Sequence, residues 1–142
     1  MKPAFTLTPF ALLRIVTGLI YIPHVLFKFQ AFDMLLGYFA KVGLQPAIFF
    51  VLLAIVTETA VVIGLTFNIL TKWLGLASTG TMAIAAYTTL FTKGEFVWTW
   101  NKGGVEYIFL LGFVSFIVAW EAWRQERAEY GRNFFLWPTK AK

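Results

Sequence analysis

The chain has 142 residues, of which 59% are hydrophobic and only 13% are charged. Because a soluble domain carries about 25% charged residues, this composition indicates a membrane protein. The sequence contains no cysteine, which excludes disulfides, thiolate metal sites and cysteine nucleophiles. Its net charge of +5 is not gathered on a basic face outside the apolar segments and the termini, so nucleic acid is not an expected partner.

Four apolar runs are long enough to cross a bilayer, since a transmembrane helix needs about 20 residues. They cover residues 9–27, 47–67, 70–91 and 105–123, and residues 124–142 follow as a tail. Lipid cannot satisfy backbone polar groups, so runs of this length without strict alternation are helices. The sequence therefore predicts an all-α, four-helix transmembrane bundle that forms one domain over residues 1–142.

The segment FQAFDMLLGYFAKVGLQP, residues 29–46, separates the first two spans. Phe32, Leu35, Leu36 and Phe39 fall at helical spacing there, and Gly43 follows as a stop signal. The pattern predicts a short amphipathic helix that lies on the outer membrane surface as a lid over the bundle. A plain connecting loop is the alternative.

Small residues are spaced four apart in the third span, at Gly75, Thr79 and Ala83. Such spacing lets helix backbones approach closely in lipid. The stripe is therefore expected to be a packing surface, either inside the bundle or between protomers.

The distribution of basic residues predicts the orientation. Four spans put both termini and the loop after the second span on one side, with seven basic residues against four on the other. The seven are Lys2, Lys72, Arg124, Arg127, Arg132, Lys140 and Lys142, and the four are Lys28, Lys41, Lys93 and Lys102. The positive-inside rule then places both termini in the cytoplasm.

An ion pair is expected inside the bundle. Arg14 and Glu58 lie about 8 Å and 13 Å from the cytoplasmic ends of their spans, at 1.5 Å per residue. Ionisable groups in the bilayer are costly and usually pair away from lipid. We therefore predict that Arg14 binds Glu58, and the simplest role for the pair is to hold two helices in register.

A second polar cluster is expected toward the outer face. His24 and Lys28 share one helix face, and Glu106 begins the fourth span at comparable depth. A lone histidine in an apolar helix is more often a core residue than a catalytic one, but titratable neighbours beside Trp100 favour a ligand site. One histidine without thiols does not supply the ligands of a zinc or copper site, so no metal is assigned.

A membrane quinone suits the residue types of this cluster. Its carbonyls need hydrogen-bond donors, its reduction takes up protons, and its ring can lie on an aromatic side chain. The donors and proton carriers would be Tyr21, His24, Lys28 and Glu106, and the aromatic residues would be Trp98 and Trp100. The sequence has no dinucleotide or haem fingerprint, so a partner would have to supply the electrons.

Three segments resemble the DoxX family of bacterial inner-membrane proteins: LLRIVTGLIYIPHVLFKF, PAIFFVLLAIVTETAVVIGLTFNILTKW and GGVEYIFLLGF. The resemblance implies a four-helix protein of the inner membrane, in a family named from a thiosulfate:quinone oxidoreductase subunit. The family-type positions that it marks are Arg14, Gly18, His24, Lys28, Glu58, Gly64, Gly104, Glu106 and Tyr107. Tyr107 thereby joins the candidate quinone-binding residues.

Three functions follow as hypotheses. The leading one is an inner-membrane redox subunit that binds a quinone at the outer mouth of the bundle and acts with a partner as a quinone-linked oxidoreductase. The second is a non-catalytic anchor or assembly subunit of a larger complex. The third is small-molecule transport by a homo-oligomer. Each requires the bilayer together with a partner subunit or a second copy of the chain.

Overall fold

The computed structural model describes residues 7–131, apart from the side chain of Trp100. The elements are the α-helices α1 (Pro9–Gln30), α2 (Phe32–Lys41), α3 (Ala47–Phe67), α4 (Thr71–Lys93) and α5 (Glu106–Tyr130), with the short 3-10 helix η1 (Trp100–Lys102). No strand occurs within the described range, and α1, α3, α4 and α5 are each long and apolar enough to cross a membrane. The predicted all-α bundle with four membrane spans is confirmed.

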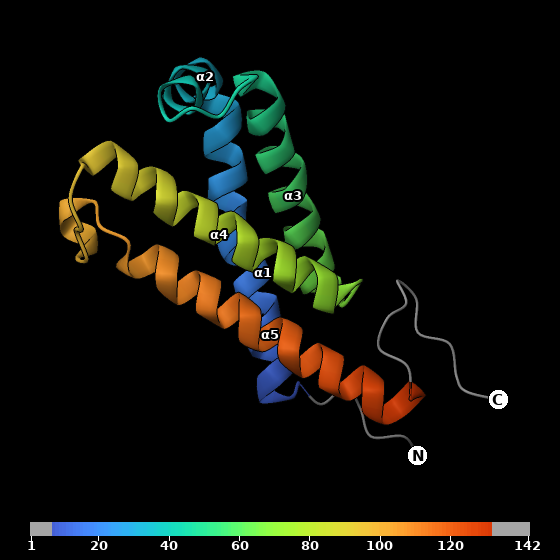
Figure 1. The fold of residues 1–142 in the computed structure, drawn as a ribbon. Coiled ribbons are helices and arrows are strands. Elements are labelled where there is room, and N and C mark those ends of the chain that lie inside the picture. Colours follow the sequence, from blue (N-terminus) through green and yellow to red (C-terminus); the bar gives the residue numbers. More distant parts are fainter. Residues whose placement is uncertain (1–6, 132–142) are drawn as a thin grey trace.

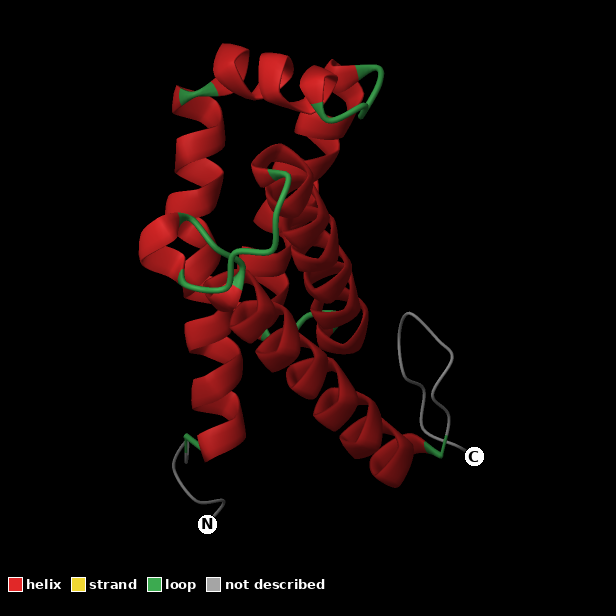
Figure 2. Ribbon diagram, turned by 60° about the vertical axis from the view of Figure 1, so that its left-hand side comes forward, coloured by secondary structure: helices red, strands yellow, loops and turns green. Residues whose placement is uncertain are grey.

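The four long helices form two antiparallel pairs. Helix α1 packs along α3, α4 packs along α5, and the second pair crosses the first obliquely (Figure 1). Helix α2 lies across the end of α1 and the start of α3, as Figure 2 shows. The predicted short helix between the first two spans therefore exists, and the beginning of α1 and the end of α5 lie at the same end of the bundle.

Helix boundaries follow ordinary capping rules. Thr8 precedes α1, and its hydroxyl accepts a 3.1 Å hydrogen bond from a first-turn amide, while Pro9 occupies a position where no amide proton is needed. Asn68 ends α3 and Gly94 ends α4, both in the left-handed conformation that such caps require. Gly131 ends α5 in the same way, so α5 extends beyond the predicted span limit of residue 123.

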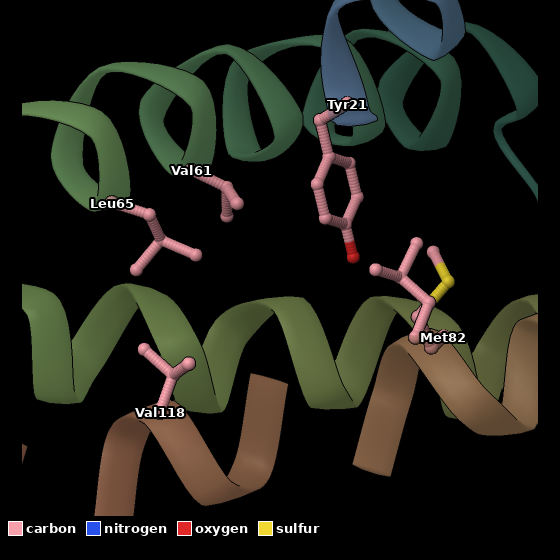
Figure 3. Close-up of a cluster of buried hydrophobic side chains, with 6 residues drawn as sticks. Tyr21, Val61, Leu65, Met82 and Val118 are labelled. Atoms are coloured by element: carbon pink, nitrogen blue, oxygen red, sulfur yellow. The ribbon is translucent and has the colours of Figure 1, made fainter. Parts of the chain in front are cut away.

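The core lies where the two helix pairs cross. Its buried side chains come from all four spans and are Tyr21, Val61, Leu65, Met82, Leu111 and Val118, most of them labelled in Figure 3. Large apolar side chains also cover the outside of the bundle, among them Val56, Phe67 and Phe109. An apolar exterior of this extent suits contact with lipid, and the chain is accordingly a multi-pass membrane protein.

Close contact between α4 and α5 depends on a glycine. A Cβ atom at Gly75 would lie 2.9 Å from both the Ala119 Cβ and the Ser115 carbonyl oxygen, so a larger residue does not fit. Thr79 adds hydrogen bonds to the carbonyl oxygens of Gly75 (2.9 Å) and Gly112 (3.2 Å). The predicted small-residue stripe thus packs inside the bundle at its first two positions, whereas Ala83 is exposed.

One basic residue expected in a loop lies inside the bundle. Lys72 belongs to the first turn of α4, is 1% exposed, and forms an ion pair with Glu126 near the end of α5. Its ammonium also lies 5.6 Å from the centre of the Trp73 ring, a cation–π distance. Lys72 therefore joins two helices, and the orientation derived from the basic residues stays a prediction.

Candidate ligand-binding groove

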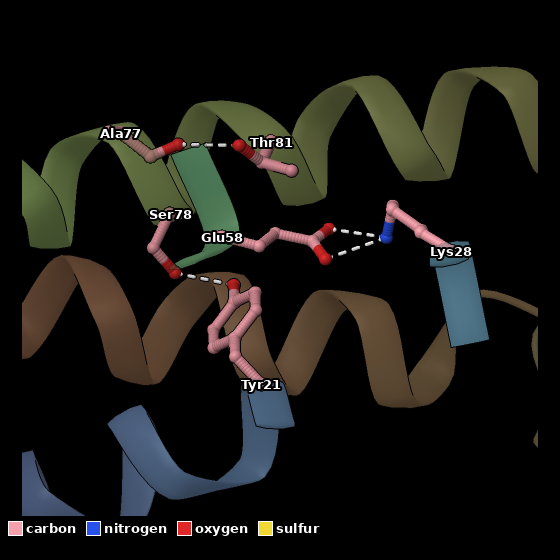
Figure 4. A network of polar contacts seen from close by, with 6 residues as sticks. All are labelled: Tyr21, Lys28, Glu58, Ala77, Ser78 and Thr81. Atoms are coloured by element: carbon pink, nitrogen blue, oxygen red, sulfur yellow. Dashed lines mark hydrogen bonds and ion pairs between the residues drawn. The ribbon is translucent and has the colours of Figure 1, made fainter. Parts of the chain in front are cut away.

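A buried ion pair joins the first and third helices. Lys28 lies in the last turn of α1 and Glu58 in the middle of α3, and the Lys28 Nζ atom is 2.8 Å and 2.6 Å from the two carboxylate oxygens (Figure 4). The two side chains are 14% and 4% exposed, respectively. Because neither charge has much access to solvent, each is the principal stabilising partner of the other.

The predicted ion pair between Arg14 and Glu58 is wrong. Arg14 instead donates hydrogen bonds from its guanidinium to the backbone carbonyl oxygens of Leu65 and Thr66, the latter at 3.2 Å. These carbonyls belong to the last turn of α3, where the helix itself has no N–H donors left for them. Arg14 is therefore a capping residue for α3, and Gly18 provides the close approach that this contact needs, since a Cβ there would lie 2.9 Å from the Thr66 hydroxyl.

A groove of ≈ 510 Å³ begins at the Lys28–Glu58 pair and continues between α3 and α4. Helix α2 lies along it and contributes Leu35, Tyr38 and Phe39. The lining is mostly apolar, and the volume falls within the range of about 300–1,000 Å³ that is usual for small-molecule sites. We call this feature the α2 groove.

The α2 groove offers hydrogen-bond donors at defined places. Lys28 has three N–H groups and uses two of them on Glu58, so one remains for a ligand. Three groove threonines instead donate to carbonyls of their own helix at 2.8–3.1 Å. The Tyr38 hydroxyl lies 3.3 Å from the Thr92 hydroxyl at the α2 side. A ligand with a carbonyl or other acceptor would therefore be recognised mainly by Lys28.

His24 and its aromatic neighbours are not among the residues that line the α2 groove. The His24 ring stacks on Tyr107 of α5, with centroids 6.0 Å apart and planes 17° apart, and lies 6.1 Å from the Tyr21 ring. Tyr21 is fully buried, and its hydroxyl is 2.5 Å from the Ser78 hydroxyl, which in turn is 2.6 Å from that of Ser115. These contacts join α1, α4 and α5. The structure therefore brings Tyr21, His24 and Tyr107 together, but in contacts that pack the helices against one another and not around the α2 groove.

The remaining predicted residues lie near the start of α5. Glu106 and Tyr107 line a separate, more open hollow of ≈ 450 Å³. The Glu106 amide donates to the carbonyl oxygen of Trp98 at 2.9 Å, and the Trp98 ring lies 5.7 Å from the ring of Phe109. The side chain of Trp100 lies outside the described part of the chain. The predicted cluster is thus divided between two places, with Lys28 alone at the α2 groove.

Sequence reasoning missed the α4 wall of the α2 groove. Apart from Ile84, its residues are small or carry hydroxyls and recur at helical spacing: Ala77, Gly80, Thr81, Ala85, Thr88 and Thr89. This stripe is visible in the sequence and differs from the Gly75 stripe, which faces α5. Its position opposite Glu58 is a property of the packing and could not be read from α4 itself.

No metal site is evident between residues 7 and 131, where histidine, aspartate and glutamate do not gather in threes. No curated protein sequence and no solved structure matches the chain. The DoxX family model matches residues 10–90, more than half of the chain, and so includes α1 to α3, most of α4, and both members of the Lys28–Glu58 pair. The chain therefore belongs to the DoxX family.

Proposed function

We propose that this DoxX-family protein is the membrane subunit of a redox system and binds a membrane quinone in the α2 groove. The observation that carries the proposal is an apolar groove of ≈ 510 Å³ that ends at a buried, charged hydrogen-bond donor. A quinone has the matching chemistry, with an apolar tail and ring and two carbonyl acceptors. Because α3 and α4 are both membrane spans, such a ligand would enter the groove from the bilayer.

Each groove residue has a distinct part in this proposal. Lys28 would donate its third N–H to a ligand carbonyl, and Glu58 would keep the ammonium in place. Leu35 and Phe39 of α2 would cover the apolar part of the ligand and keep water away from the charged pair. A bound quinone supplies the two-electron chemistry, and a partner protein would supply the electrons.

The first experiment asks whether the purified protein carries a quinone. The chain is purified in mild detergent and extracted with organic solvent, and the extract's absorbance is recorded before and after borohydride reduction. We expect a quinone spectrum from the wild-type protein and at least a ten-fold weaker one from Lys28→Met, since a lost charged hydrogen bond costs about 1.5–3 kcal/mol.

Two matched variants locate the site. Gly80 lines the α2 groove with open space around its Cα, so Gly80→Phe fills the groove without a backbone clash. Ala83 is exposed on the same helix, so Ala83→Phe adds the same ring outside the groove. Loss of quinone in Gly80→Phe but not in Ala83→Phe would support the proposal, whereas loss in His24→Ala alone would move the site to the His24–Tyr107 contact.

A non-catalytic anchor is the second candidate. Both buried ion pairs, Lys28–Glu58 and Lys72–Glu126, join different helices, and such pairs can hold a bundle in register without any ligand. An empty extract from folded protein, together with no thermal shift on adding ubiquinone or menaquinone analogues, would favour this function over quinone binding.

A further inference from the structure

A second hollow lies at the opposite end of the bundle from α2. Its volume is ≈ 410 Å³, and it follows the outer side of α5 beside α4. The lining residues are Leu76, Phe116, Ala119, Trp120 and Trp123, with Arg124 and Arg127 at the end of the series. Along α5, the lining of the hollow therefore changes from apolar and aromatic side chains to positively charged ones.

The two arginines differ in whether their guanidinium groups already form an ion pair. Arg124 is 70% exposed and forms a surface ion pair with Glu121, at 2.7 Å, on its own helix. Arg127 is also exposed, and its guanidinium forms no ion pair with another residue of the range 7–131. Guanidinium groups recognise phosphate through paired hydrogen bonds. The end of the hollow is therefore suited to an anionic phosphate, chiefly through Arg127.

The dimensions match one membrane leaflet. Eleven residues separate Phe116 from Arg127, which at 1.5 Å per residue is about 16 Å along α5. Half of a bilayer's hydrocarbon core is about 15 Å thick. Trp120 and Trp123 lie between these two positions and are of the type that concentrates at the membrane interface. An acyl chain beside Phe116 would therefore belong to a lipid whose headgroup is level with Arg127.

We propose that this hollow binds an anionic glycerophospholipid, with an acyl chain along α5 and the phosphate on Arg127, assisted by Arg124. Basic residues beside membrane helices are a common means of selecting anionic lipids. Charge complementarity favours an anionic lipid over a zwitterionic one, and the apolar lining favours a lipid over free phosphate. The site shares no lining residue with the α2 groove, so it is independent of the proposed quinone function.

The test measures lipid retention by native mass spectrometry. The full chain in detergent is titrated with phosphatidylglycerol or with phosphatidylcholine of the same acyl chains. We expect the wild type to retain phosphatidylglycerol preferentially and Arg127→Gln to bind it about five-fold more weakly, the ratio that corresponds to about 1 kcal/mol per basic residue at an anionic surface. Arg127→Lys should retain part of the preference because it keeps the charge.

Controls separate this site from general electrostatic attraction. Lys41→Gln removes an exposed charge at the end of α2 and should leave retention unchanged. Phe116→Ala should weaken binding of both lipids while preserving the preference for phosphatidylglycerol. Equal retention of the two lipids by the wild type, an equal loss in Lys41→Gln, or displacement of phosphatidylglycerol by millimolar inorganic phosphate would each overturn the proposal. Unchanged thermal unfolding of Arg127→Gln verifies that the variant is folded.

Discussion

The Lys28–Glu58 ion pair should respond to mutation as a coupled unit. Glu58→Gln removes the counter-ion of a lysine whose side chain is only 14% exposed, so solvent cannot replace it. Removing one partner of a buried pair costs about 3–5 kcal/mol, whereas removing both charges is often nearly neutral. We therefore expect the double variant Lys28→Met, Glu58→Gln to recover most of the stability that Glu58→Gln loses.

Thermal unfolding in mild detergent measures this effect. For a chain of this size, 1 kcal/mol shifts the midpoint by about 2–4 °C, so Glu58→Gln should unfold about 6–20 °C below the wild type. The matched control is Arg14→Met, Glu58→Gln, which leaves the lysine charge in place and should be no more stable than Glu58→Gln alone. Recovery in this control, and none in the lysine double variant, would refute the pairing that the structure shows.

Three further predictions concern the packing of the bundle. Gly75→Leu should lower the free energy of unfolding by about 1–3 kcal/mol because its side chain would separate α4 from α5. Gly80→Ala, which has open space at its Cα, should leave the stability of the protein undiminished. Equal melting curves for the two variants would contradict this reasoning. Arg14→Met should cost about 1–3 kcal/mol in the same melting assay, because it leaves carbonyl oxygens at the end of α3 without their donor, and Arg14→Lys should lose less. Tyr21→Phe should cost about 1 kcal/mol and Ser78→Ala more, since Ser78 contacts two hydroxyls; the reverse order would show that these contacts contribute little.

The membrane fold was predictable because its determinants are local. A span needs length and apolar character, and both are visible in a single segment. The short helix α2 was predictable for the same reason, since Phe32, Leu35 and Phe39 mark one face and Gly43 follows its end. Which helices pair, and which faces meet, depends on contacts between distant segments and could not be read in this way.

The error over the ion pair shows what was missing. The prediction measured the depth of each residue from the end of its own span, as if α1 and α3 were aligned at their ends. In the structure Arg14 is level with Leu65, whose carbonyl it binds, and Glu58 lies seven residues earlier in α3. At 1.5 Å per residue this offset along the helix axis is about 10 Å, about twice the difference of about 5 Å between the predicted depths of Arg14 and Glu58. Lys28 instead approaches Glu58 from the other end of α1.

The candidate site was predictable only in its polar members. Lys28 and Glu58 are conspicuous because charge in an apolar span requires an explanation. The quinone itself was a hypothesis about residue types, and it had placed the ligand at His24. The α4 wall of the groove contains no comparably unusual residue, since threonine and alanine are common in transmembrane helices that only pack against other helices.

The buried ion pair between Lys72 and Glu126 has a consequence for how the helices assemble during translation. Helix α4 brings a lysine to its first turn, and the matching glutamate is synthesised more than fifty residues later, near the end of α5. The ion pair between these two charges forms only when both helices are present. We therefore expect α4 to complete its packing within the bundle only after translation has reached the end of α5.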